Sequence, residues 1–404
     1  MRAGLLHRLF LVSSVAAILA ATLSSNPGEE PERLLTCVVC GDRGLADVLV
    51  NVLLFLPFGA AVAAAGVPLQ RCVLGGALLS AGIEFAQLYI PGRDPSLGDV
   101  LADTLGSGVG AALVATAPYW LLPARAQAAR LSRGAALAAA ALCWVTAWLL
   151  APALPRSHSW SLWTPNIANL EWYRGRLQDA AIGSLRLPAG RIPDSAAVRE
   201  RLLSPHGFSI HVRGIAGPHT AALSALLTIH DEQGREIVLL GPDGNDIVFR
   251  FRTRATAWRL DQPDIRVPGA LRSINPGDAL DVTVHGRGGR YSITVDSSGT
   301  TGLGLTVGSG WAVLMYPEAL PAGLKTLLSL VCCAAMWVPA GFWARSQRDA
   351  WITGGVLAAT LLGVPAVTSL HATPLLQWAA AGLGGLAGAI CRWRLDAGSG
   401  PGRG

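Results

Sequence analysis

The sequence predicts a polytopic α-helical membrane protein into which an all-β domain is inserted. Of the 404 residues, 51% are hydrophobic, and the mean hydropathy of +0.42 is too high for a soluble globular protein. Residues 1–152 and 320–391 are nearly continuous apolar runs, whereas 156–318 has the composition of an ordinary globular domain. Apolar and polar residues alternate at several places inside 156–318, which is typical of half-buried strands.

About twenty apolar residues are needed to span a bilayer, so the two apolar regions predict about eight transmembrane helices. The predicted spans are 5–23, 46–65, 71–91, 98–117, 134–152, 321–343, 350–370 and 374–391. The first could instead be a cleaved signal peptide, because Arg2 and Arg8 precede an apolar stretch that ends in small residues. No clear Ala-x-Ala cleavage site follows that stretch, which favours a retained helix.

The arginines predict how these helices are oriented. Arg2 and Arg8 precede the first span, and every second connection after it also carries arginine. These later arginines are Arg71, Arg125, Arg130, Arg133, Arg345, Arg348, Arg392 and Arg394. By the positive-inside rule, both termini are then cytoplasmic and 156–318 is extracytoplasmic. Lys325 is the only lysine, and this bias, with abundant Ala and Gly, is typical of a GC-rich bacterial genome, so we expect a bacterial inner membrane.

Two cysteines, Cys37 and Cys40, lie in a loop that this orientation places outside the cytoplasm. A disulfide is chemically permitted there. A zinc site would need a second ligand pair, and a redox pair would need a thioredoxin-like setting that the loop lacks. We therefore expect a structural disulfide and no metal.

A set of polar residues stands at fixed places within the apolar segments near the N-terminus. The set comprises Asn51, Glu84, Gln87, Arg93, Asp94, Asp99 and Asp103. Glu84 and Gln87 lie three apart on one predicted helix and share a face. Asp99 and Asp103 lie four apart on the next helix and do the same. A charged side chain in a bilayer costs roughly 2.5–3.5 kcal/mol on insertion scales and usually serves a function. We expect these groups to converge on one outward-opening cavity, with Arg93 and Asp94 at its lip.

Three interpretations of this set are open. It could hold a proton or a divalent cation, it could bind an amine or polar headgroup, or it could be a purely structural interhelical hydrogen-bond knot. The chain has no nucleophile–base pair, no His-Glu-x-x-His motif and no phosphate-binding glycine loop. We therefore predict no catalytic residue and no cofactor. The alternative is a membrane enzyme that uses Glu84, Asp99 and Asp103 on a lipid headgroup, and a third option is an envelope scaffold.

The pattern around these residues resembles the VanZ-like family over about residues 45–117. The shared motifs are Asn51 before Leu54-Phe-x-Pro57-x-Gly59, then Glu84-x-x-Gln87, Pro91-x-Arg93, Asp99-Val-Leu and Leu105-Gly-x-x-x-Gly110. One departure is Asp103, where the family usually carries Asn. The resemblance implies a cell-envelope role, since founding members are linked to low-level resistance to the glycopeptide teicoplanin. We expect the protein to bind an envelope lipid or glycan, such as a polyprenyl-linked precursor or a cell-wall strand.

Residues 156–318 predict two packed antiparallel sheets. Apolar residues alternate along Asp246–Thr253, and Leu280–Val284 and Tyr291–Val295 form a predicted hairpin around a turn at His285–Arg290. Further strand-like runs are 208–215, 223–230, 236–240 and 303–315. The arrangement resembles laminin-G and concanavalin A-like jelly-roll modules, which often bind glycans. Candidate exposed-loop residues for a sugar contact are Trp258, Arg259, Asp261 and Asp264, although Trp258 could equally be core.

The last three predicted spans resemble a second copy of the polar unit. Met336-Trp-Val-Pro339-Ala-Gly341 repeats Leu54-Phe-Leu-Pro57-Phe-Gly59 in spacing and character. At the same offset Glu84 aligns with Ala366 and Gln87 with Ser369. After a loop four residues shorter, Asp99 aligns with Gln377 and Asp103 with Ala381, and Gly106 and Gly110 align with Gly384 and Gly388. The alternative is chance recurrence in Gly- and Ala-rich helices.

The predicted organisation follows from these observations. It consists of a first helix and outer Cys loop (1–45), a VanZ-like domain (46–152), the extracytoplasmic sandwich (156–318), a degenerate three-helix repeat (320–391) and a cytoplasmic tail (392–404). Membrane lipids are the expected partners, with cell-wall glycan or a polyprenyl-linked precursor. Nucleic acid is not expected, because 156–318 balances seventeen Arg against fifteen Asp plus Glu.

Overall fold

The computed structural model describes residues 2–24, 38–39, 41–93, 95–167, 170–316 and 320–398. The chain divides into two compact units. The first unit is Met1–Ala128 together with Trp258–Asp261, and the second is Ala129–Ala257 with Gln262–Gly404. The predicted span 134–152 begins earlier as the helix α6 (Arg125–Leu149), because the alanines before it also favour a helix.

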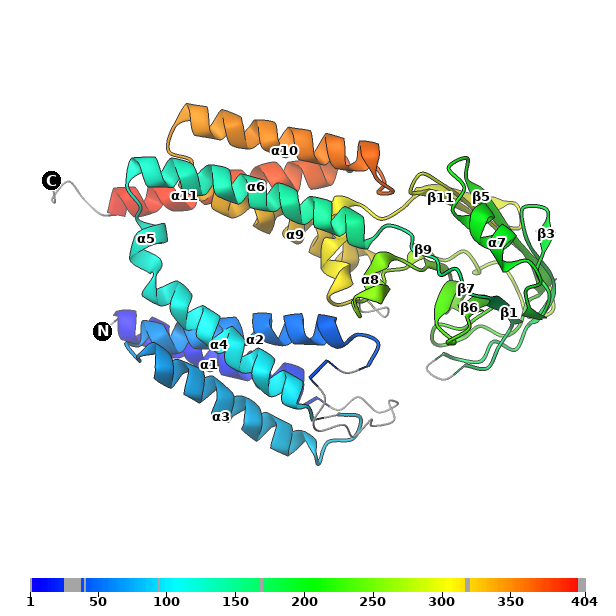
Figure 1. Ribbon diagram of the computed structural model, residues 1–404, viewed down its shortest axis with the longest axis horizontal. Coiled ribbons are helices and arrows are strands. Elements are labelled where there is room, and N and C mark those ends of the chain that lie inside the picture. The colour runs from blue at the N-terminus through cyan, green and yellow to red at the C-terminus, as the bar shows by residue number, and fades with distance from the viewer. Residues whose placement is uncertain are drawn as a thin grey trace. The chain divides into compact units, whose positions relative to one another are not determined.

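The first unit is built from four long helices and one short helix (Figure 1). These are α1 (Arg2–Thr22), α2 (Gly44–Ala64), α3 (Leu69–Gln87), α4 (Leu97–Ala115) and α5 (Ala117–Leu121). α4 packs on both α2 and α3, and α1 packs on α2. Each long helix begins and ends within a few residues of its predicted span, because the long apolar runs and the loop residues between them mark the boundaries.

Glycines set the close approach of α2 and α4. A methyl group on Gly106 would overlap the carbonyl oxygen of Val52, and one on Gly110 would overlap that of Leu56. From the opposite side, Gly59 lies against the backbone of Ser107. The Gly-x-x-x-Gly face of α4 thus admits α2 as a close neighbour.

The second unit contains α6, α9 (Ala322–Trp343), α10 (Gln347–Val367) and α11 (Leu375–Gly398). α9 and α11 meet in the same way as α2 and α4. A methyl group on Gly384 would overlap the carbonyl of Ala334, one on Gly388 that of Val338, and Gly341 lies against the backbone of Gly385. These six positions are the alignment equivalents of the six in α2 and α4. The matched contacts are what a duplicated helical unit would produce.

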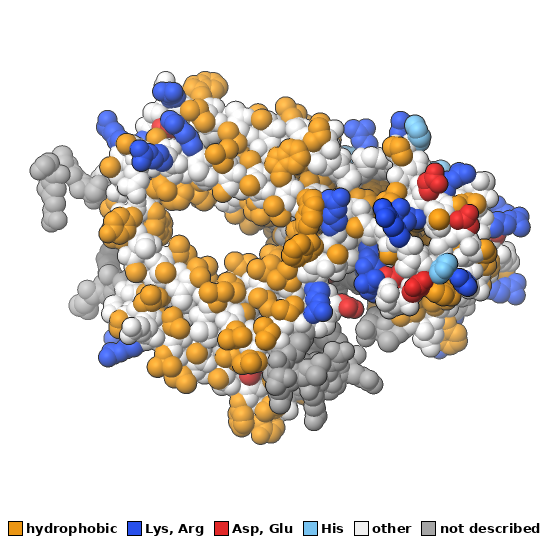
Figure 2. Space-filling view, viewed as in Figure 1, with side chains coloured by type: hydrophobic (Ala, Val, Ile, Leu, Met, Phe, Trp, Pro, Cys, Tyr) orange, Lys and Arg blue, Asp and Glu red, His pale blue; other side chains and the backbone are white. Residues whose placement is uncertain are grey.

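Hydrophobicity identifies the chain as a membrane protein. Among the described helices five are long and apolar enough to cross a membrane, namely α2, α4, α6, α9 and α10, and α1 has a shorter apolar stretch, Arg8–Thr22. Large apolar side chains such as Leu78 and Leu105 are more than half exposed on their helices. Figure 2 shows hydrophobic side chains spread over the helices, with charged ones gathered at helix ends and over the β domain. The expected eight spans are therefore supported for five helices.

The β domain of the second unit consists of two six-stranded sheets whose paired strands are antiparallel. The first has the order β4 (Gly190–Arg191), β1 (Ser159–Trp163), β6 (Leu227–Asp231), β7 (Glu236–Asp243), β8 (Asp246–Phe251), β9 (Ile265–Val267). The second has the order β12 (Ser298–Leu303), β11 (Arg290–Val295), β10 (Ala279–Arg287), β5 (Phe208–Ile215), β2 (Arg176–Ile182), β3 (Leu185–Arg186). Short helices α7 (Ser195–Leu202) and α8 (Arg254–Ala257) lie between strands in sequence.

The core of this sandwich is formed by the alternate apolar residues that predicted the strands. Ile210, Val212, Val282, Val284 and Phe249 are fully buried in one cluster. The prediction of two packed antiparallel sheets is confirmed, and the β10–β11 hairpin turns more tightly than predicted, with only residues 288–289 between the strands.

One strand prediction is wrong. Residues 303–315 do not form a strand, because only Leu303 ends β12 and the chain then enters the 3₁₀ helix η1 (Val307–Val313). Thr306 and Ser309 form a reciprocal capping box that starts this helix. Glycines at 308 and 310 pack against Gln377 and Thr146, and this irregular, glycine-rich backbone has no period-two pattern to sustain pairing.

Candidate functional site

The acidic residues of α3 and α4 gather around the start of α4. Ser96 is the N-cap residue of α4, and its side chain accepts a hydrogen bond from the backbone N–H of Asp99 over 3.0 Å. The backbone N–H of Ser96 donates to Glu84 Oε2 over 2.6 Å, which joins the end of α3 to this cap. Asn51 Nδ2 on α2 donates to Asp99 Oδ1 over 2.7 Å. Three helices thus meet at Glu84, Asp99 and Asn51.

Asp103 lies one turn further along α4 and is almost completely buried, with 3% of its surface exposed. Ser80 Oγ on α3 donates to Asp103 Oδ2 over 2.6 Å. The other carboxylate oxygen, Oδ1, has no hydrogen-bond partner among the described residues. One further turn along, Ser107 is fully buried and its Oγ also has none there. We call Asn51, Ser80, Glu84, Asp99, Asp103 and Ser107 the acid cluster.

The acid cluster has an excess of hydrogen-bond acceptors. Glu84, Asp99 and Asp103 lie within range of one another's charge, and Arg93 also acts on Asp99 at a distance. In the part of the chain that the structure describes, no arginine or lysine forms an ion pair with these carboxyl groups. Likewise, no group of three or more His, Cys, Asp or Glu in the described residues is arranged to hold a metal ion. The cluster is therefore suited to a partner that donates hydrogen bonds.

Ser80 and Ser107 were not predicted from the sequence. Ser80 lies four residues before Glu84 and Ser107 four residues after Asp103, so helical spacing places each on the same face as a predicted carboxylate. That spacing was the available signal. It is weak because serine is common in apolar helices, where it also bonds to the carbonyl of the preceding turn.

Gln87 and Arg93 do not join the acid cluster. Gln87 Nε2 donates to the carbonyl oxygen of Thr22 over 3.0 Å, at the end of α1. Arg93 donates to the carbonyl oxygens of Ser24 over 2.8 Å and Ala21 over 2.9 Å. Both side chains therefore satisfy carbonyl groups at the C-terminal end of α1, where positive charge is favoured. Asp94, Cys37 and Cys40 lie outside the described residues.

The candidate glycan residues have other roles. The carbonyl oxygen of Arg259 accepts hydrogen bonds from the N–H groups of Leu45 over 3.2 Å and Ala46 over 3.3 Å, at the start of α2. Asp261 pairs with Arg43 at 2.9 Å. The segment Trp258–Asp261 therefore caps α2 within the first unit. Trp258 itself is 54% exposed, so its prediction as a surface residue holds and its prediction as a sugar contact stays a prediction.

The prediction that Asp264 lies in an exposed loop is wrong. Asp264 is 6% exposed and accepts hydrogen bonds from Arg266 over 3.1 Å and from the Tyr316 hydroxyl. Burial raises the pKa of Tyr316 and the nearby Asp264 carboxylate raises it further, so the phenol keeps its proton and donates. Arg266 also bonds to Asp243 over 2.6 Å, and Lys325 lies over the Tyr316 ring. A buried ionic network of this kind is structural.

Comparison with known proteins agrees with the first unit. Residues 8–118 match a family model described as VanZ/LLP1. This range begins earlier than the motif resemblance and covers most of α1 as well as α2, α3, α4 and every residue of the acid cluster. No curated protein and no solved structure matches the chain, and no family match accompanies the β sandwich. Residues 8–118 are therefore a VanZ-like part of a membrane protein.

Proposed function

We propose that this VanZ-like membrane protein belongs to the bacterial cell envelope and binds the polar headgroup of an envelope lipid at the acid cluster. The observation that carries the proposal is Asp103 Oδ1, a buried carboxylate oxygen without a hydrogen-bond partner in the described chain. A buried polar atom left unpaired costs about 1–3 kcal/mol, and more if it is charged. A headgroup that brings an N–H, an O–H or a cationic amine would remove this cost.

A purely structural knot explains the cluster less well. The pairs Asn51–Asp99 and Ser80–Asp103 already join α4 to α2 and α3. Interhelical hydrogen bonds of this kind contribute about 0.6 kcal/mol each on average. A hydrogen-bond network that served only helix packing would not need two more unpaired acceptors. These are Asp103 Oδ1 and Ser107 Oγ, which lie one turn apart on one helix face.

The proposed placement is a bacterial inner membrane crossed by all eight long helices, with both termini cytoplasmic and the sandwich extracytoplasmic. Its support is the alternation of arginine-rich and arginine-poor connections along the chain. In this placement Ser96, which caps α4, is near the outer surface and Asp103 lies about 10 Å deeper, at 1.5 Å of rise per residue. A polyprenyl-linked precursor is then one lipid that could reach it, and altered access to such a lipid would connect the protein to the glycopeptide resistance that the resemblance implies.

We further propose that α9, α10 and α11 are a degenerate copy of α2, α3 and α4. The three matched backbone contacts support this copy, as does the shared order of elements. At the aligned positions the acid cluster is lost: Asn51, Ser80, Glu84, Asp99 and Asp103 become Cys333, Leu362, Ala366, Gln377 and Ala381. Binding by the acid cluster would therefore occur in the first copy alone.

Native mass spectrometry of the detergent-purified full chain tests the lipid proposal. We expect a co-purifying lipid on the unchanged protein and about a tenfold lower occupancy in Asp103→Leu, which removes the free acceptor. Asp103→Asn replaces one acceptor by a donor and should also lower occupancy. Ser132→Ala is the control, because Ser132 is equally buried but bonds to Ala340 in the second unit.

Two other functions predict different outcomes. For an envelope scaffold, lipid occupancy would be unchanged in Asp103→Leu, and the variant would lose only the modest stability of the Ser80–Asp103 hydrogen bond. For a membrane enzyme, the lipid would be converted during incubation, and Glu84→Gln would abolish the conversion while leaving the folded amount unchanged.

A further inference from the structure

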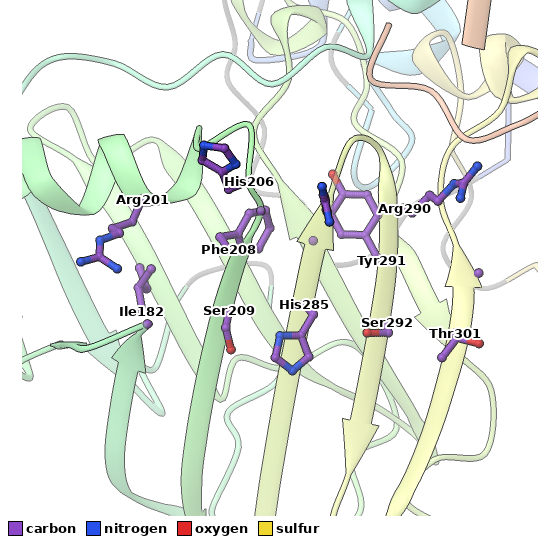
Figure 3. Close-up of a pocket in the computed structure, with 15 residues that line it drawn as sticks. Ile182, Arg201, His206, Phe208, Ser209, His285, Arg290, Tyr291, Ser292 and Thr301 are labelled. Carbon is purple, nitrogen blue, oxygen red and sulfur yellow. The ribbon is translucent and has the colours of Figure 1, made fainter. Parts of the chain in front are cut away.

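The β sandwich has an open hollow that none of the predicted sites includes. It has a volume of about 610 Å³ and lies at the end of the second sheet, where β2, β5, β10, β11 and β12 run side by side (Figure 3). This volume is within the range of small-molecule sites, which is about 300–1,000 Å³. All of its lining residues belong to the second unit.

The floor of the hollow is a row of polar side chains on the outer face of the sheet. Ser209 on β5 is paired with His285 on β10, and His285 is paired with Ser292 on β11. Figure 3 shows these three and Thr301 of β12 following one another across neighbouring strands. They face outward because their neighbours Ile210, Val284 and Ile293 point into the core. The row presents hydroxyl and imidazole groups at the spacing of adjacent strands.

The rim of the hollow is basic. Arg201 comes from α7 and His206 from the loop before β5, while Arg287 and Arg290 flank the tight β10–β11 turn. No Asp or Glu lines the hollow. Within the described residues no hydrogen bond or ion pair engages the side chains of these arginines, and all three are exposed. Three arginines in a lining that has no Asp or Glu make the hollow positive and leave their bidentate donors available.

Phe208 and Tyr291 also border the hollow, but their rings pack against the core on the opposite face of the sheet. The two rings lie edge to face, with centroids 6.3 Å apart, and both also contact the ring of Phe249 in the core. Gly286 between them leaves no room for a side chain, since an added methyl group would come within 2.5 Å of the Phe208 ring. Burial raises the pKa of Tyr291 to about 12, in keeping with a ring that faces the core.

We infer that this hollow binds an anionic saccharide, whose carboxylate or phosphate is held by Arg287, Arg290 and Arg201 and whose hydroxyls contact Ser209, His285 and Ser292. The three arginines favour an anion, and the row of hydroxyl and imidazole groups beside them favours a sugar over a bare ion. The inference does not depend on the acid cluster, because the two sites share no residue and lie in different units.

Isothermal titration of the detergent-purified full chain tests this inference with glucose 1-phosphate, glucuronate, glucose and inorganic phosphate as probes. We expect at least one anionic sugar to bind about tenfold more tightly than either glucose or inorganic phosphate. Only an anionic sugar can contact both the arginines of the rim and the polar row on the floor. Arg287→Gln with Arg290→Gln should weaken that binding at least about tenfold. Arg186→Gln is the matched control, since Arg186 is an exposed arginine on β3 of the same sheet outside the hollow, and it should change affinity less than about twofold.

Three outcomes would overturn the inference. The first is that neither anionic sugar binds at millimolar concentration, and the second is that the double variant binds as tightly as the parent. The third is tight binding of soluble dihexanoyl phosphatidylglycerol, lost in the double variant, without binding of either sugar, which would assign the hollow to a lipid headgroup instead. Melting curves of the variants show that each remains folded.

Discussion

Gly106 in α4 lies against the carbonyl oxygen of Val52 in α2 so closely that no side chain fits between them. The same contact recurs between Gly384 in α11 and Ala334 in α9. Since lipid tails are as apolar as leucine, helices in a membrane gain mainly from close packing, and small residues make that packing available. Each bundle therefore depends on its glycine face.

Gly106→Ala and Gly384→Ala should each destabilise the protein by about 1–3 kcal/mol, the usual cost of overpacking. Thermal unfolding in detergent measures this. The controls are Gly75→Ala and Gly382→Ala, where an added methyl group meets nothing within 4 Å and where alanine favours the helix by up to about 1 kcal/mol. Equal melting temperatures for Gly106→Ala and Gly75→Ala would contradict the packing argument.

Ser80→Ala should destabilise the first unit by about 1–3 kcal/mol, because it removes the donor that pairs with Asp103 Oδ2 inside the bundle. In an Asp103→Leu background the same substitution should have little effect, since the acceptor is already gone. A double-mutant cycle on thermal unfolding measures this coupling. Additive effects of the two substitutions would show that the hydrogen bond contributes nothing to stability.

Acid should weaken the β sandwich through Asp231. Burial raises the pKa of this carboxyl group, but hydrogen bonds from the backbone and guanidinium of Arg235 outweigh burial and hold the pKa below its ordinary value. A depressed folded-state pKa gives stability that is present above the unfolded pKa of about 3.9 and is lost as pH falls through the folded value.

Hydrogen exchange of β6, β7 and β8 between about pH 6 and about pH 2.5, referenced to the intrinsic exchange rate at each pH, measures this loss. Asp231→Asn should be less stable than the parent near neutral pH and should lose less on acidification. Asp179→Asn on β2 is the control and should keep the parent's acid response. An acid response unchanged in Asp231→Asn would refute the assignment to this residue.

The proposed orientation predicts which cysteines a membrane-impermeant maleimide can reach in spheroplasts. In a background with Cys37 and Cys40 replaced by serine, Arg186→Cys in the sandwich should be labelled without permeabilisation. The native Cys391, exposed near the end of α11, should be labelled only after the membrane is opened. The reverse result would place the sandwich in the cytosol and remove the acid cluster's proposed access to an outer-leaflet lipid.

The sequence predicted the helices well because each depends on a long local signal. The predicted span 321–343 and the observed α9 differ by one residue, and β5 matches its predicted run at both ends. The strands β1, β2, β3, β4 and β9 were not predicted, and the predicted run 303–315 touched only the last residue of β12. Two-residue strands such as Leu185–Arg186 carry no periodicity and form only where a partner strand is already placed.

The acid cluster was predicted in part for a related reason. Acidic residues such as Glu84, Asp99 and Asp103 are rare in apolar helices, so the sequence alone marks them as candidates. The sequence does not mark their partner Ser80 in this way, because its contact with Asp103 depends on how α3 and α4 are rotated against each other. The basic hollow could not be predicted from the sequence for the same reason. Arg201 and Arg287 are 86 residues apart in sequence, and only the order of the strands brings them to one hollow.

Gln377 occupies in α11 the position that Asp99 occupies in α4, and its amide is bound to Thr306 over 2.7 Å and to the backbone of Gly308 over 3.3 Å. These two residues open η1, which follows directly from the last strand of the sandwich. A tilt of α11 must therefore carry η1 along with it.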